Sequence, residues 1–110
     1  MAAKFELKKS RNDKFLFNLL GDNGQALVTS EMYEAKASAL NGIESVRKNS
    51  AEEKRFELLS AKDGASYFSL KATNGQVIGS SPMYASAALR DAAIAAVRSG
   101  AAAAQLDDQT

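Results

Sequence analysis

The sequence contains neither cysteine nor histidine among its 110 residues. Without cysteine, the fold cannot depend on disulfides, and the usual ligands of structural zinc are missing. Without histidine, the chain lacks the side chain that most often transfers protons near neutral pH. We therefore expect no metal, no cofactor and no catalytic triad built on histidine.

Long apolar runs and a charge excess are also missing. The most apolar stretch, residues 92–104, is interrupted by Arg98 and consists largely of weakly apolar alanine, whereas a membrane span needs about 20 apolar residues. The first ten residues have no apolar core of signal-peptide length. The net charge is only +1, without the basic excess that binding to a phosphate backbone favours. These features predict a cytoplasmic protein that does not bind membranes.

The sequence does contain an internal repeat. Residues 4–49 align with residues 55–100 at a constant offset of 51 without a gap, and fifteen of the aligned pairs are identical. An ungapped match along the whole unit indicates an internal duplication. We therefore predict a single domain over residues 1–110, with repeat one at residues 4–51 and repeat two at residues 55–102.

Each unit predicts three strands followed by a helix. In repeat one, polar and apolar residues alternate before and after residues 10–13, and a third apolar run follows Asn23-Gly24, a dipeptide that favours a two-residue type I′ turn. This turn would place Leu27 and its counterpart Ile78 on the outer face, unless a bulge shifts the register; both alternatives remain open. The helix follows from apolar residues spaced by three and four over residues 35–48.

Three strands and one helix form too small a core and leave a sheet edge exposed. Two units related by a pseudo-twofold axis would complete that core by joining edge to edge. The expected fold is therefore α+β, with two tandem β-β-β-α repeats forming one antiparallel sheet and both helices packed on one face. Two alternatives exist for residues 103–110, disorder or an edge strand. We expect the chain to be a monomer.

The segments NGQALVTSEMY, NGIESVRKN and NGQVIGSSPMY resemble the YegP family of small bacterial proteins of unknown function. The resemblance covers nearly the whole chain, including the tandem arrangement. It implies an α+β fold in which two repeats share one antiparallel sheet, with exchange of terminal strands between the halves as one arrangement. It carries over no catalytic motif.

Six residues are candidates for a binding site because they recur in both units: Tyr33, Tyr84, Arg47, Arg98, Gln25 and Gln76. The tyrosines could stack on a ligand or a base, or simply pack at the corner between strand and helix. The arginines could bind an anion together, or complement the negative ends of the two helix dipoles. The glutamines could form paired binding tips, or be solvated residues beside turns.

The sequence favours a non-catalytic binding or interaction module over an enzyme. A peptide or protein partner would bind at a sheet edge or on the open face of the sheet, since unpaired backbone groups of an edge are a template for strand addition. The alternative is a weak single-stranded nucleic-acid binder that uses Tyr33, Tyr84 and basic residues. An enzyme based on Glu6 and Glu57 ranks third, because it requires the two carboxylates to lie close together.

Overall fold

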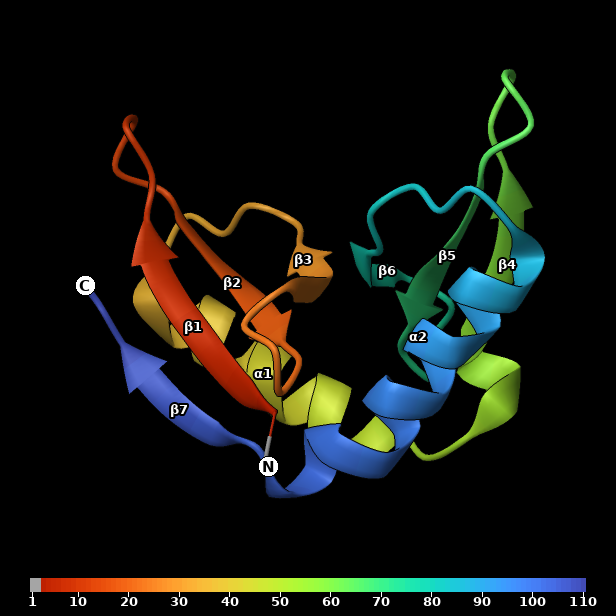
Figure 1. Cartoon of the computed structure of the whole chain (residues 1–110). Helices are drawn as coiled ribbons and strands as arrows, with labels where there is room; N and C mark the ends of the chain where they lie inside the picture. The colour runs from red at the N-terminus through yellow and green to blue at the C-terminus, as the bar shows by residue number, and fades with distance from the viewer. Residues whose placement is uncertain (1–2) are drawn as a thin grey trace.

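The computed structural model describes residues 3–110. It shows a seven-stranded sheet covered by two helices (Figure 1). The strands are β1 (Lys4–Lys9), β2 (Phe15–Leu20), β3 (Ala26–Ser30), β4 (Phe56–Ser60), β5 (Ser66–Lys71), β6 (Val77–Ser80) and β7 (Gln105–Asp108). The helices are α1 (Lys36–Asn49) and α2 (Ala87–Gly100), followed by the 3-10 turns η1 (Glu53–Arg55) and η2 (Ala101–Ala103). Within residues 3–110, no helix is long and apolar enough to cross a membrane.

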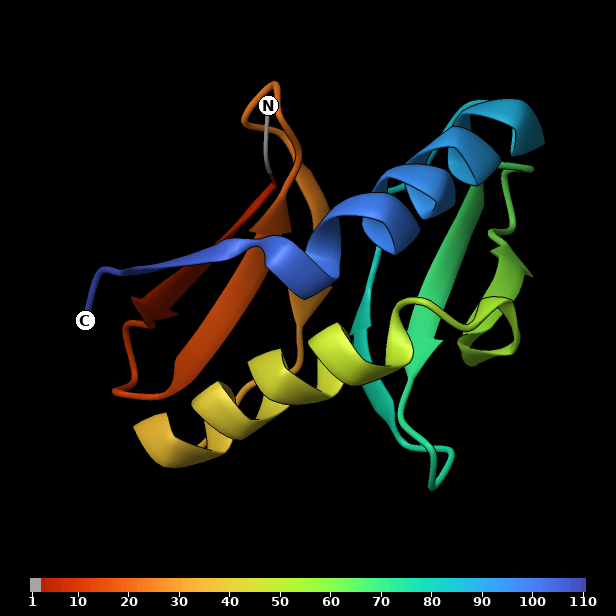
Figure 2. The ribbon, with the colours of Figure 1, turned by 90° about the horizontal axis from the view of Figure 1, so that it is seen from below.

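The two repeats are the two halves of this sheet, in the order β4-β5-β6-β3-β2-β1-β7. They join where β3 pairs antiparallel with β6, through Thr29 with Ser80 and Ser30 with Gly79. Both helices lie on the same face of the sheet (Figure 2), and one continuous core of buried residues draws on both repeats. The α+β fold predicted from the duplication is confirmed.

The core repeats the same aromatic contact in each half. Phe5 meets Phe17 edge to face at 5.9 Å between ring centroids, and Phe56 meets Phe68 in the same manner at 5.5 Å. Edge-to-face packing is favoured by the opposite charges of ring edge and ring face. The identical residues of the two repeats therefore perform the same packing role.

The C-terminal segment differs from the expectation of a purely antiparallel sheet. Of the two alternatives for residues 103–110, disorder and an edge strand, the structure has the strand: β7 pairs with β1 in parallel. The sheet is therefore mixed, because six strands are antiparallel and the seventh returns from α2 in the direction of β1. The terminal strand of repeat two thus completes the edge of repeat one.

The prediction of two-residue type I′ turns is wrong. Gly21 N–H donates to the Gln25 carbonyl at 2.8 Å, and Gly24 N–H donates to the Gly21 carbonyl at 3.0 Å. The two bonds enclose a three-residue loop, residues 22–24, in which only Gly24 has a positive φ angle, 81°. A type I′ turn needs two residues with positive φ. The pairing then shifts by one residue between Leu19 and Leu20, and in repeat two between Leu70 and Lys71. Of the two alternatives, the bulge is therefore present: Leu27 packs against the core and Ile78 is buried in it.

The same loop closes all four hairpins, and three of them have glycine in the left-handed position. The first hairpin has Asp13 there, at φ 64°. A side chain costs roughly 1 kcal/mol in this conformation, somewhat less for aspartate. We expect Asp13→Gly to raise the free energy of unfolding by about 0.5 kcal/mol, measured by urea denaturation. Gly64→Asp at the matching position of repeat two should lower it by a similar amount, and a stabilising Gly64→Asp would contradict this explanation.

Candidate interaction site at the open edge of the sheet

The two ends of the sheet are not equivalent, although the repeats are. At one end β7 covers β1, while at the other end no strand of residues 3–110 pairs with the outer side of β4 (Figure 1). The chain path explains this difference. The segment after α2 is free to become β7, but the segment after α1 passes through η1 directly into β4. Repeat one therefore has no terminal strand left to cover repeat two.

Backbone and side-chain contacts both hold β7 on β1. Gln109 N–H donates to the Leu7 carbonyl at 2.9 Å, which shows that the backbone groups of Leu7 face β7. Arg47 Nη2 donates to the Ala104 carbonyl at 2.6 Å, and its guanidinium lies over the Phe5 ring. Ala104 is almost completely buried. The groove between β1 and α1 is therefore filled by the chain itself.

Ion pairs fix the acidic end of β7. Lys36 Nζ donates to Asp108 Oδ2 at 2.7 Å, and Lys4 Nζ lies 3.4 Å from Asp107 Oδ2. Hydrogen bonds from Lys36 and from Thr110 lower the pKa of Asp108 from its ordinary 3.8 to about 2. Because the pKa in the folded state is depressed, this contribution is present above about pH 4 and is lost as the pH falls toward 2.

We therefore expect β7 to loosen in acid before the rest of the sheet. Between pH 4 and pH 2, the amide protons of residues 105–108 should lose protection from hydrogen exchange before those of β2 and β5. In Lys36→Met the selective loss should become smaller, because the largest of the contributions that lower the pKa of Asp108 is removed. Simultaneous loss in β7 and β5 would contradict this role of Asp108.

An unfilled groove of about 410 Å³ occupies the equivalent place beside β4. It is lined by Glu53, by Phe56 and Leu58 of β4 and by Asp91, Ile94 and Arg98 of α2, and we call it the β4 groove. Leu58 is 56% exposed, whereas its repeat counterpart Leu7 is 0% exposed. By the same alternation that turns Leu7 toward β7, the N–H and C=O of Leu58 point away from β5. The exposed apolar side chain of Leu58 and its unpaired backbone groups thus occur together at this edge.

The repeated residues that were candidates for a binding site do not lie together in the structure. Tyr33 is half-buried and stacks on Phe17 with an angle of 11° between the rings, so one ring face is already occupied. Burial raises the pKa of Tyr33, with a further contribution from Glu31, and burial alone raises that of Tyr84. The two tyrosines bridge to different hairpins, through Phe15 and Ser66 respectively. They therefore lie at two separate corners between strand and helix, and a stacking role for either stays a prediction.

The two arginines lie at opposite ends of the sheet. Arg47 contacts Phe5 of β1 and Ala104 just before β7, whereas Arg98 lines the β4 groove, so they do not form a common anion site. Of the glutamines, Gln76 lines a shallow groove that also includes Tyr33, and Gln25 is exposed at its turn. Of the six candidates, Arg98 is the one that lies in the β4 groove.

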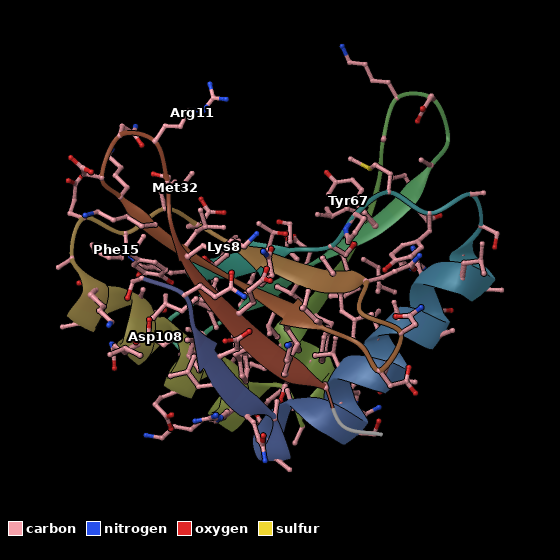
Figure 3. All side chains as sticks on the ribbon, turned by 60° about the vertical axis from the view of Figure 1, so that its left-hand side comes forward. Lys8, Arg11, Phe15, Met32, Tyr67 and Asp108 are labelled. Carbon is pink, nitrogen blue, oxygen red and sulfur yellow. The ribbon has the colours of Figure 1, made fainter. Side chains whose placement is uncertain are left out.

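Glu6 and Glu57 lie in strands separated by four others. A polar row crosses the open face along the paired positions Glu6, Asn18, Thr29, Ser80, Ser69 and Glu57. Five strand spacings are roughly 24 Å along the sheet, too far for acid–base work on one substrate. Lys8 and Tyr67 lie on this same face (Figure 3). No group of three potential metal-ligating side chains occurs among the described residues.

Sequence reasoning named a sheet edge as a place for a partner, but it missed Leu58 and Asp91 and did not identify which edge is open. A signal for it was present in the sequence. Two copies of the Phe-Glu-Leu strand imply two outer edges, while only one segment, residues 101–110, follows a helix without leading into another repeat. Counting the strands available for each edge would have identified β4 as uncovered.

Known proteins are similar to this chain in both sequence and fold. A family model described as a domain of unknown function, DUF1508, matches residues 10–57 and 61–108. The chain is 51% identical to UPF0339 protein PA0329 of Pseudomonas aeruginosa and 47% identical to UPF0339 protein YegP of Escherichia coli K12, over the full length of each.

Two solution NMR structures have nearly the same fold. The yegP protein of unknown function from E. coli matches with a TM-score of 0.94 and 47% identity, over 100% of this chain and 95% of that one. UPF0339 protein SO3888 from Shewanella oneidensis matches with a TM-score of 0.93 and 45% identity, over 98% and 92%. The tandem arrangement is therefore common to this chain and both structures.

Proposed function

The chain belongs to the DUF1508 family, whose relatives here carry the names UPF0339 and YegP, and we propose that it is an interaction module that binds an extended peptide segment at the outer edge of β4. The segment adds to the sheet as an eighth strand. Main-chain hydrogen bonds supply the affinity in such complexes, and side-chain pockets supply the selectivity.

One observation carries this proposal, the contrast between Leu7 and Leu58. Both occupy the same position of the repeat, yet Leu7 is completely buried and Leu58 is 56% exposed. Fully burying a leucine side chain contributes roughly 1.5–3 kcal/mol, so a strand that covers Leu58 gains part of that energy. The occupied groove beside β1 shows that this fold accommodates such a strand.

Selection from a random decapeptide display library, with the full-length chain as target, tests the proposal. Enriched peptides should bind the wild-type protein and lose at least about tenfold in affinity on Leu58→Pro. Proline is tolerated in an edge strand where its missing N–H faces outward, and here it removes the donor that a new strand would use. Leu58→Ala is the matched control: it removes the side chain but keeps that donor, so it should weaken binding less than Leu58→Pro does.

A second edge variant, Leu58→Lys, keeps the backbone and places a charge in the groove, so it tests the site if the proline variant is unstable. It should also abolish binding. Enriched peptides that bind Leu58→Pro and Leu58→Lys as tightly as the wild type would overturn the proposal, as would a selection without enrichment.

A further inference from the structure

The β4 groove differs in charge from the groove that β7 fills. At three positions along the helix, α1 has Lys36, Leu40 and Arg47. At the same positions of the repeat, α2 has Ala87, Asp91 and Arg98. One arginine is kept, a lysine is lost and an acid replaces a leucine. A strand with the sequence of β7 therefore does not match the β4 groove, and the changes indicate what does.

The first position of the incoming strand follows from Arg98. Its counterpart Arg47 donates to the carbonyl of Ala104, which is 3% exposed. Arg98 lines the β4 groove at the equivalent place and can donate to a carbonyl in the same way. Because the side chain at this position points at the core, as that of Ala104 does, only a small residue fits.

The third position lies against both apolar and acidic groups. In the filled groove Leu106 takes this position, opposite Phe5. In the β4 groove, Phe56 and Ile94 supply apolar contact, and Asp91 supplies a carboxylate. Arg90 engages Oδ1 of Asp91 at 3.1 Å, so an incoming cation would bind Oδ2. Lysine and arginine suit such a site, because their stems pack on apolar surface while the charge reaches the acid.

The fourth and fifth positions follow from Arg55 and Leu58. Lys4, which pairs with Asp107 at the fourth position, is replaced by Arg55. Arg55 Nε already donates to Glu52 at 2.8 Å, so an acidic residue of the incoming strand would bind the remaining N–H groups of its guanidinium. Lys36, which binds Asp108 at the fifth position, is replaced by Ala87. With exposed Leu58 opposite and no cation from α2, the fifth position favours an aliphatic side chain.

We propose that the β4 groove recognises a parallel strand of a partner protein with the pattern small, any, basic, acidic, aliphatic. This inference rests on the proposed function and specifies its ligand. It also excludes the tail of a second copy as the partner, because Leu106 and Asp108 place an apolar side chain beside Asp91 and an acid beside Ala87. The charge difference between the grooves thus keeps the chain from polymerising through its own β7.

Two synthetic decapeptides test this pattern on the full-length protein. The probe has the sequence of residues 101–110 with Leu106→Lys and Asp108→Leu, and the reference has the unchanged sequence. We expect the probe to bind at least about tenfold more tightly in an NMR titration, with the largest amide shifts at residues 56–60. Equal affinities, tighter binding of the reference, shifts confined to β1 or a probe that does not bind would each overturn the inference.

Asp91→Asn tests the basic position separately. It should weaken binding of the probe about threefold to fivefold, which corresponds to about 0.6–1 kcal/mol, the upper part of the range for an exposed ion pair, and leave the reference unchanged. Asp63→Asn removes the same charge at a hairpin tip and is the matched control, with no expected effect. A probe affinity unchanged in Asp91→Asn would contradict the role of Asp91.

The two proposals fail in different ways. If peptides selected from the random library depend on Leu58 but lack a basic third residue and an aliphatic fifth residue, the edge binds strands and the ligand pattern is wrong. If the selected peptides do not depend on Leu58, the edge itself is not the binding site and both proposals fall.

Discussion

Gly79→Ala is expected to lower the free energy of unfolding by about 2–3 kcal/mol, the upper range for inserting a methyl group into a packed interior. A Cβ at Gly79 would lie 2.6 Å from the backbone oxygen of Thr29 and 2.8 Å from a methyl carbon of Val28. The Thr29 oxygen belongs to the strand that joins the two repeats, so it cannot move without disturbing that junction. The repeat alignment places Val28 at the position of Gly79, and only one of the two can carry a side chain there.

Gly21→Ala is the matched control, because its new Cβ would meet neighbours at 3.4 Å and beyond, which is ordinary contact. Removing a glycine there should change the free energy of unfolding by less than about 1 kcal/mol, and in the stabilising direction. Both variants can be compared by urea denaturation at constant pH. Equal stability of Gly79→Ala and Gly21→Ala would show that the β3–β6 junction tolerates separation.

Deletion of residues 104–110 is expected to lower the free energy of unfolding by about 3 kcal/mol. The deletion removes β7, uncovers Phe5 and Leu7, and leaves Arg47 without the Ala104 carbonyl. The buried apolar side chains and the backbone hydrogen bonds of β7 together contribute more than about 3 kcal/mol to stability. The net loss is smaller, because the deletion also removes the entropy cost of ordering seven residues.

A chain in which residues 104–110 are replaced by a glycine-serine segment of equal length separates strand pairing from chain length. It should be as unstable as the deletion. A synthetic peptide of residues 104–110 should bind the deletion variant and restore protection of the Leu7 amide from hydrogen exchange. Full stability of the deletion variant, measured by urea denaturation, would mean that β7 contributes nothing to the sheet.

Much of the architecture could be predicted because the two repeats have the same pattern of apolar residues and therefore the same fold. Identical residues such as Phe17 and Phe68 occupy the same core position in each half, and alternation of apolar residues places them there without tertiary information. Gly42 follows the same logic: its α1 position lies so close to Tyr33 that a Cβ would be 2.5 Å from the tyrosine oxygen. A small residue at this position is what the close approach of α1 to Tyr33 and Phe17 requires.

The hairpin loops and β7 could not be predicted in the same manner. Asn-Gly suits both a type I′ turn and a three-residue loop, and only the hydrogen bonds around Gly21 and Gln25 distinguish them. The sequence of β7 ends in two successive aspartates, so alternation does not predict a strand there. Its position depends instead on cations supplied from far along the chain, Lys4, Lys36 and Arg47.

The candidate site was hidden for a related reason. Leu58 carries the same local pattern as Leu7, and its exposure depends on a strand that is missing at one end of the sheet. Such an absence is a property of the chain path rather than of any local motif. By contrast, the recurring tyrosines and arginines were predicted as binding residues, yet Tyr33 and Arg47 pack against Phe17 and Phe5 within the chain.

Hydrogen exchange at the amides of Leu7 and Leu58, compared in the free full-length protein at pH 6 and low concentration, tests the central claim most directly. With β1 covered by β7 and β4 uncovered, the Leu58 amide should exchange at least about a hundredfold faster than that of Leu7. Its neighbour Glu57, which faces β5, should remain protected. Slow exchange of Leu58 at the rate of Leu7 would show that the outer edge of β4 is already covered and has no place for a further strand.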